Sequence, residues 1–218
     1  MFFPMLFNSV LLFALIVAPM AQAGDSMVIT DFSTSVGASG VPAGWELKEK
    51  SGKADFAVVK DGDVVAGRFR SANTSFSLQK EVKVDLKQYP WLTWKWKVTK
   101  LPAGGDFRKS KTDDQAAQLF VAFSKTKAIV YIWDTTAPAG LMEDTSPVPF
   151  MTVKVVVMRS GPAEFGKCIT ETRNVYDDYK KLYGSEPPAV NGVRLQSNSQ
   201  HTGTSGEGYF ADVIFKNK

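Results

Sequence analysis

The sequence predicts an all-β fold: a two-layer antiparallel β-sandwich of the jelly-roll type, with one short helix near residues 174–183. Two observations lead to this prediction. Short runs rich in β-branched and aromatic residues alternate with clusters of Gly, Pro, Asp and Ser. Only one segment carries a full set of helix-terminus signals. A single cysteine cannot form an internal disulfide, and one His with one Cys nearly excludes zinc. A hydrophobic core must therefore hold the fold together.

The first 23 residues contain no charged side chain and end in Ala21-Gln22-Ala23, a small-x-small cleavage pattern after an apolar run. We interpret 1–23 as a signal peptide cut after Ala23, with a retained anchor as the alternative. The protein is then expected to be periplasmic or secreted, without stable membrane insertion after cleavage. No linker or repeat divides 24–218, which is expected to form one domain.

Eleven runs between residues 27 and 215 have the composition of β-strands. The runs at 118–124 and 128–133 are apolar on both faces and are expected at the centre of a sheet. The run at 80–86 alternates apolar and charged residues and is expected to be half-exposed. The other expected strands are 27–32, 56–60, 64–69, 92–98, 152–158, 168–175, 192–197 and 208–215.

The helix is expected over 174–184. Asn174 is a suitable N-cap, two aspartates occupy the first turn, two lysines occupy the last, and Gly184 can take the left-handed conformation after it. Stabilisation of the helix dipole explains the aspartates without a ligand. One helix face carries Tyr176, Tyr179 and Tyr183.

The strand at 92–98 is rich in tryptophan. Side chains in a strand alternate, so Trp94 and Trp96 share one face while Trp91, Lys95 and Lys97 share the other. We expect Trp94 and Trp96 in the core and Trp91 at the start of an outward basic row. That row is interpreted as a solvated face, with contact to a polymer as the alternative.

Four stretches of the chain carry a family resemblance: "YPWLTWKWKVTKLPAGGDFRKSKTDDQAAQLFVAF", "IVYIW", "ETRNVYDDYKKLYG" and "YFADVIF". They resemble the domain of unknown function 3047 family, a bacterial group of mostly exported proteins. The resemblance covers nearly all of the chain after the leader. It implies common ancestry but no activity. Family members commonly have an Asp-rich stretch near the end, which 196–208 lacks.

The candidate ligand-binding residues are Trp91, Asp106, Asp113, Asp114, Arg173 and Tyr179, and none is assigned as catalytic. Asp113 and Asp114 are adjacent, so in a strand they would point to opposite faces and could not flank one glycosidic bond. They are expected either to cap their loop or to contact a ligand or cation. Arg173 is expected to bridge to one of them, or to bind a carboxylate on a sugar.

The remaining reactive residues give no catalytic site. His201 lies among turn-forming residues, where we expect a mobile loop, and Cys168 is expected to be a buried, inert thiol. Neither a Gly-x-Ser-x-Gly elbow nor a phosphate-binding loop occurs.

No cofactor is required by the sequence, but a structural calcium ion between Asp31 and Asp212 is a hypothesis. Asp212 would share a strand face with Phe210 and Ile214, where a buried carboxylate needs an ion or donors. The alternative is a hydrogen bond from backbone amides or a basic side chain.

The sequence does not reveal a reaction. The leading interpretation is an exported bacterial envelope protein acting as a non-catalytic, carbohydrate-binding-module-like domain with a glycan or another envelope ligand as partner. The first alternative is a lyase-type polysaccharide enzyme using Arg173, Asn174, Tyr179 and His201. The second is a structural domain that binds another protein. A net charge of +4 favours anionic partners only weakly, and no nucleic-acid partner is expected.

Overall fold

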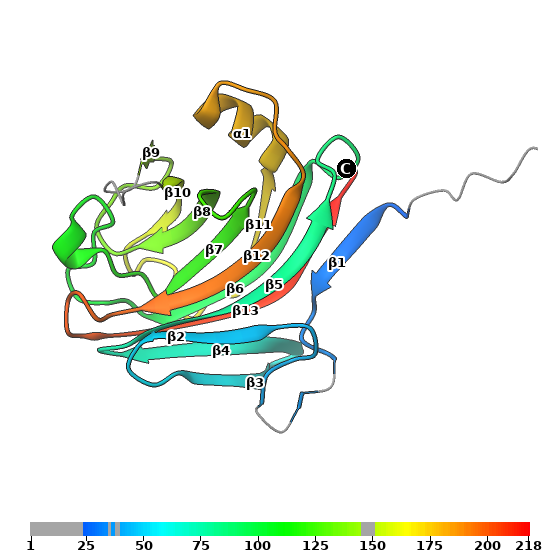
Figure 1. Cartoon of the computed structure of the whole chain (residues 1–218). Helices are drawn as coiled ribbons and strands as arrows, with labels where there is room; N and C mark the ends of the chain where they lie inside the picture. The colour runs from blue at the N-terminus through cyan, green and yellow to red at the C-terminus, as the bar shows by residue number, and fades with distance from the viewer. Residues whose placement is uncertain (1–23, 35, 38–39, 145–150) are drawn as a thin grey trace, which may run out of the picture.

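The computed structural model describes residues 24–34, 36–37, 40–144 and 151–218, which form two β-sheets packed face to face (Figure 1). The fold class is therefore the predicted β-sandwich. The predicted signal peptide lies outside the described residues. Among the residues that are described, no helix is long and apolar enough to cross a membrane.

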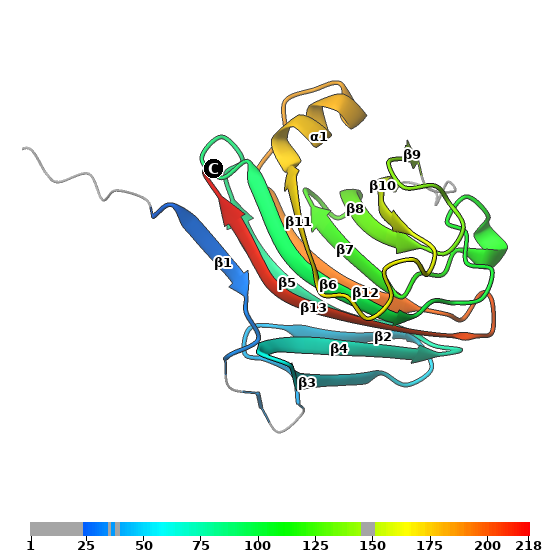
Figure 2. The ribbon, with the colours of Figure 1, turned by 180° about the vertical axis from the view of Figure 1, so that it is seen from behind.

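The six-stranded sheet is seen in front when the molecule is viewed from behind (Figure 2). The first half of its long strand β13 pairs with β4 and the second half with β1, while β6 lies along its other side. Its strands are β11 (Ile169–Asn174), β6 (Trp91–Lys100), β13 (Ser205–Lys216), β4 (Val64–Ala72), β3 (Asp55–Asp61) and β1 (Ser26–Thr30).

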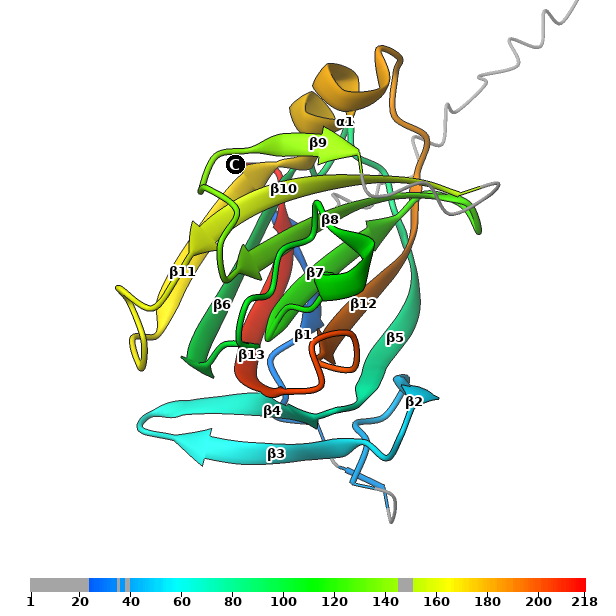
Figure 3. The same cartoon turned by 90° about the vertical axis from the view of Figure 1, so that its left-hand side faces the viewer.

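The seven-stranded sheet faces the viewer in Figure 3, with its strands in order from β9 to β2. Its strands, in spatial order, are β2 (Glu46–Ser51), β5 (Ser75–Val84), β12 (Val190–Asn198), β7 (Ala117–Ala122), β8 (Lys127–Asp134), β10 (Thr152–Ser160) and β9 (Met142–Asp144). The pair β8 and β10 is parallel, which departs from the expected antiparallel layers, whereas the other described strand pairs are antiparallel.

Two of these strands were not expected from the sequence. β2 reads "ELKEKS" and is almost entirely polar, because it is an edge strand with both faces largely in contact with water. β9 is only three residues long and lies at the opposite edge. Neither carries the apolar alternation by which strands are recognised in a sequence.

The helix α1 (Val175–Tyr183) covers one end of the sandwich (Figure 1). The Asn174 side chain accepts a hydrogen bond from the backbone N–H of Asp177, and Gly184 is left-handed with φ 66°, so both predicted caps are confirmed. A short 3-10 helix, Ser110–Thr112, lies in the loop between β6 and β7.

The core between the sheets is strongly aromatic. Trp94 and Trp96 are both buried, with ring centroids 5.5 Å apart, and Trp133 packs 5.8 Å from Trp96. Trp91 is partly exposed, so the predicted facing of this strand is confirmed.

Candidate ligand groove on the seven-stranded sheet

The outward face of the seven-stranded sheet has an apolar half and a polar half. Phe120 on β7, Val130 on β8 and Val155 on β10 lie opposite one another in the strand register. They belong to a second buried cluster, separate from the inter-sheet core, which Phe107 and Ala137 help to cover. The central strands β7 and β8 are therefore apolar on both faces, as the sequence predicted.

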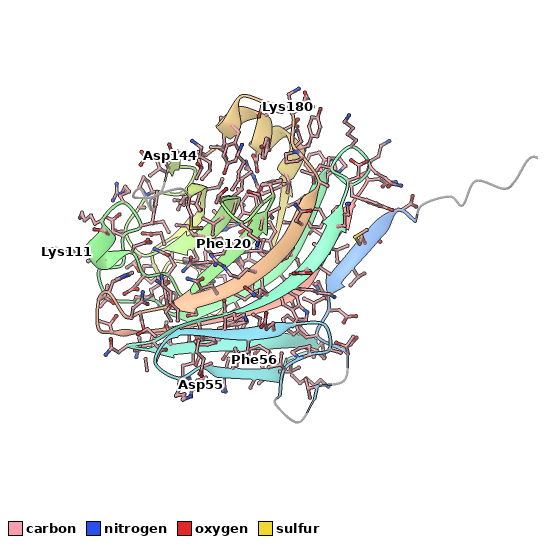
Figure 4. All side chains as sticks on the ribbon, viewed as in Figure 1. Asp55, Phe56, Lys111, Phe120, Asp144 and Lys180 are labelled. Carbon is pink, nitrogen blue, oxygen red and sulfur yellow. The ribbon has the colours of Figure 1, made fainter. Side chains whose placement is uncertain are left out.

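A single row of side chains continues the outward face from Phe120 to the sheet edge. Phe120 lies opposite Arg194 on β12, Arg194 opposite Gln79 on β5, and Gln79 opposite Glu46 on β2. The Gln79 amide donates a 3.0 Å hydrogen bond to Glu46. Figure 4 labels Phe120 among the central strands of the sheet. We call this set the cross-sheet row.

The cross-sheet row lies in a groove of about 1150 Å³. This volume slightly exceeds the range of about 300–1,000 Å³ usual for small-molecule sites, so it suits a chain of several units. The groove is lined by Gly44, Glu46, Gln79, Lys80, Glu81, Val82, Lys83, Phe120, Ala122, Ser124, Lys125, Lys127, Ala128, Met151, Asn191, Gly192, Val193 and Arg194. Ten of these 18 residues are polar or charged, so the groove is more polar than the usual small-molecule pocket, with its apolar surface near Phe120, Ala122 and Ala128.

Arg194 is the most unusual of these residues. Its guanidinium carbon lies 3.6 Å from the centroid of the Phe120 ring, and its Nε–H is covered without an acceptor among the described residues. Burial lowers the pKa of Arg194 to about 10. The alternation in "GVRLQS" puts the side chain of Arg194 on the opposite face of the strand from the buried Val193 and Leu195. Nothing in the sequence shows that this side chain lacks a partner.

The predicted aspartates lie in the loop between β6 and β7, at the other end of β12. Asp106 accepts two hydrogen bonds from the Arg108 side chain, at 2.7 and 2.9 Å, and these lower the pKa of Asp106 below its usual range. Asp114 is fully buried and accepts hydrogen bonds from the Asn198 amide and the backbone N–H of Thr202. Asp106 and Asp114 therefore bind groups of the protein itself, and for Asp114 this is the loop capping expected from the sequence rather than contact with a ligand.

Asp113 and the buried Asp134 are linked by Gln115, whose amide reaches a carboxylate oxygen of each, at 3.1 and 3.3 Å. Burial raises the pKa of Asp113 and of Asp134. Asp134 was not singled out in the sequence, although an acid directly after an apolar strand is a usable signal.

Arg173 does not bridge to Asp113 or Asp114 as expected. Both nitrogens of its guanidinium fork bind the carboxylate of Asp178, which also accepts a 2.8 Å hydrogen bond from the hydroxyl of Tyr131. Asp178 is buried, so dipole stabilisation alone does not explain it. The residues of the expected bridge are far apart because they lie near opposite ends of β12.

Tyr179 is buried against Phe123, with ring centroids 4.6 Å apart. Its hydroxyl accepts a 3.3 Å hydrogen bond from Lys127, which is its one link to the groove among the described contacts. Trp91 lies on the other sheet, opposite Lys216 and Asn174. The six predicted ligand-binding residues therefore do not form one site.

The hypothetical lyase residues are also separated. Arg173, Asn174 and Tyr179 lie at the helix end of β12, whereas His201 follows its far end, roughly 25–30 Å away along nine residues of strand. His201 contacts the loop between β6 and β7: its Nδ1 lies 3.0 Å from the carbonyl oxygen of Asp113 and 3.4 Å from the carboxylate of Asp114.

Two further expectations are corrected. Cys168 is exposed rather than buried, because it lies in the turn region just before β11. A bulge in β13 at Asp212, with φ 49°, turns this residue away from the face of Phe210, and Lys95 pairs with it at 2.8 Å.

The calcium hypothesis gains no support from this geometry. Asp31 accepts hydrogen bonds from the backbone and hydroxyl of Ser33. Within the described ranges, no three His, Cys, Asp or Glu residues are grouped so as to hold a metal ion. The calcium site between Asp31 and Asp212 stays a hypothesis, and the contact of Asp212 with Lys95 agrees with the alternative of a basic side chain.

The fold and the groove define a β-sandwich domain with an open, polar-rimmed site on one sheet. The model of the family described as "Protein of unknown function (DUF3047)" matches residues 43–214. The chain belongs to this family, as its sequence motifs suggested. No match was found among curated proteins.

Solved structures are similar to most of this chain at low sequence identity and with TM-scores below 0.5. The family 11 carbohydrate-binding module of a cellulosomal cellulase of Clostridium thermocellum is 8% identical, with a TM-score of 0.46, over 89% of this chain and 96% of that chain. The xyloglucanase domain of NopAA from Sinorhizobium fredii, in complex with cellobiose, is 8% identical, with a TM-score of 0.49, over 81% and 95%. An adhesin domain of Lys-gingipain from Porphyromonas gingivalis is 12% identical, with a TM-score of 0.43, over 88% and 98%.

Proposed function

We propose that this protein is a non-catalytic glycan-binding domain of the bacterial envelope, and that it binds an extended sugar chain in the groove of the seven-stranded sheet. The cross-sheet row carries this proposal. An apolar patch at Phe120 and Ala122 lies beside a guanidinium, an amide and a carboxylate on adjacent strands. A sugar ring presents apolar C–H faces and polar hydroxyl edges, and this surface offers a partner for each.

The test is to screen the purified mature chain against a glycan array and to measure the affinity of the best binder by calorimetry. Gly192→Leu places a side chain in the groove without adding charge. A Cβ at Gly192 would lie 3.4 Å from the carbonyl oxygen of Lys80 and 3.9 Å from Ala122, so the fold can accept it. Lys60→Leu, on an exposed position of β3 in the other sheet, is the matched control.

We expect Gly192→Leu to abolish binding and Lys60→Leu to leave it unchanged, with both variants folded by circular dichroism. An empty array, or undiminished binding by Gly192→Leu, would refute the groove as a glycan site. Release of shorter sugars from a bound polymer would refute the non-catalytic assignment.

Export with cleavage after Ala23 is proposed from the uncharged apolar start and its small-x-small ending. Mass spectrometry of the native protein should find a mature N-terminus at Gly24. A membrane fraction carrying the peptide that begins at Met1 would show a retained anchor instead.

A further inference from the structure

Five of the six arginines in the chain have a carboxylate partner. The carboxylate lies at 2.9 Å or less for each of Arg68, Arg70, Arg108, Arg159 and Arg173. The side chain of Arg194 makes no ion pair and no hydrogen bond among the described residues. The ranges that the structure leaves undescribed contain no Asp or Glu, so they hold no carboxylate that could pair with Arg194.

Arg194 is partly buried. Partial burial of a cation without a partner is unfavourable, and it is unusual outside functional sites. The two acids of the groove do not neutralise Arg194. Glu46 lies two strands away in the cross-sheet row, at roughly 10 Å, and binds Gln79 and Lys48. Glu81 lies opposite Gly192 rather than opposite Arg194, and it is exposed.

The groove as a whole is positively charged. Its lining contains five basic residues and two acidic ones: Lys80, Lys83, Lys125, Lys127 and Arg194 against Glu46 and Glu81. The lining therefore has three more basic than acidic residues, although two of its lysines already have hydrogen-bond acceptors: Lys80 donates to the Ile29 carbonyl and Lys127 to the Tyr179 hydroxyl.

We infer that the groove is specific for an acidic glycan, and that a sugar carboxylate, as in a uronic acid, binds the guanidinium of Arg194. This inference rests on the proposed glycan function. Stacking on Phe120 fixes the plane of the guanidinium, and a planar fork of N–H donors matches the two oxygens of a carboxylate. The bound carboxylate would be the negatively charged partner that Arg194 lacks.

The same observations disfavour a nucleic acid as the occupant. Single strands bind through exposed aromatic rings on which bases stack. Phe120 is the one aromatic residue among the described residues of the lining, and a single ring that is 8% exposed offers no series of stacking positions for successive bases. The test must therefore distinguish binding of a nucleic acid from binding of an acidic glycan.

The experiment is a binding screen of the mature chain on uronate-containing, sulfated and neutral glycans, with a single-stranded oligonucleotide included. The best binder is then titrated against Arg194→Gln, Arg194→Lys, Glu81→Gln and the control Lys60→Gln. We expect uronate glycans to dominate, their binding to weaken as NaCl is raised, and esterification of the carboxylates to abolish it.

Arg194→Gln should weaken binding about 10- to 100-fold, the range for a lost charge-assisted hydrogen-bonded pair. Arg194→Lys should lose most of the same affinity, because its point charge lacks the planar fork. Glu81→Gln should strengthen binding, since it removes an acid from the groove, and Lys60→Gln should change nothing.

Strong binding of neutral glycans alone, reduced by Gly192→Leu, would overturn the inference while keeping the proposed function. Binding of nothing would overturn both. A preference for sulfated glycans or for the oligonucleotide over uronates would overturn the carboxylate assignment. Equal affinity of Arg194→Gln and the unmodified chain would also overturn it.

Discussion

Replacing Arg194 with methionine should stabilise the protein. Met keeps the length and apolar character of the arginine stem and removes the charge. The pKa of Arg194 is lowered from 12.5 to about 10, and each unit corresponds to about 1.4 kcal/mol. The charged form therefore costs about 3 kcal/mol in the folded state at neutral pH, and stacking on Phe120 offsets about 1 kcal/mol of this.

The net expected gain is about 2 kcal/mol, which corresponds to a rise in Tm of about 4–8 °C for a domain of this size. The sign is fixed by the direction of the shift. A base whose pKa is lowered on folding destabilises the fold at every pH below about 10, and the penalty disappears only as the pH rises above 10 toward 12.5. The gain should therefore be complete at pH 7.

The assay is thermal unfolding followed by circular dichroism at pH 7 and low salt, without glycan. Arg173→Met is the contrasting variant, because it leaves the buried Asp178 without its guanidinium and should cost about 3 kcal/mol or more. A fall in the Tm of Arg194→Met would refute the reasoning, since it would mean that the guanidinium has a partner in solution, with Glu81 the nearest candidate.

Three further outcomes are expected. Trp96→Ala should lower the free energy of unfolding by about 3–5 kcal/mol in a urea titration, because Trp96 is almost fully buried, and an unchanged midpoint would contradict this core position. Asp113→Asn should raise the Tm more at pH 7 than at pH 4 in paired thermal melts. Burial raises the pKa of Asp113, so the folded state tolerates the protonated acid, present at low pH, better than the carboxylate that forms as the pH rises through the raised pKa. Asn removes that cost, which is present at pH 7 and largely absent at low pH. An equal effect at both pH values would be inconsistent with the raised pKa. EGTA should leave the Tm unchanged, because Asp212 is paired with Lys95. A Tm that falls with EGTA and recovers with Ca²⁺ would support a calcium ion between Asp31 and Asp212.

Much of the fold could be predicted from local patterns. The alternation around Trp94 and Trp96 gives their facing, and the helix caps are a matter of a few adjacent residues. The exposed edge strand β2 was missed because a strand that buries neither face needs no apolar period. Asp212 was predicted to share a strand face with Phe210 because side chains alternate along a strand. The bulge at Asp212 interrupts this alternation, so the prediction was wrong.

The groove could not be found in this way. Gln79, Phe120 and Arg194 are separated by 41 and 74 positions in the chain, and only strand pairing brings them side by side. The sequence shows where cations are, but whether a cation has a partner depends on contacts between distant strands. Candidates such as Arg173 and Asp114 were singled out for their chemistry and proved to be satisfied within the fold.

The double-sided burial of β7 and β8 has a consequence for how a ligand would be received. Their amides should be among the slowest to undergo hydrogen exchange, since apolar clusters cover both of their faces and opening them requires disruption of both. The part of the groove floor that β7 and β8 supply is thus preorganised, whereas the polar edge strand β2 is free to fray. A sugar chain arriving at this surface would meet a rigid template on one side and an adjustable rim on the other, so little conformational entropy need be lost from the protein on binding.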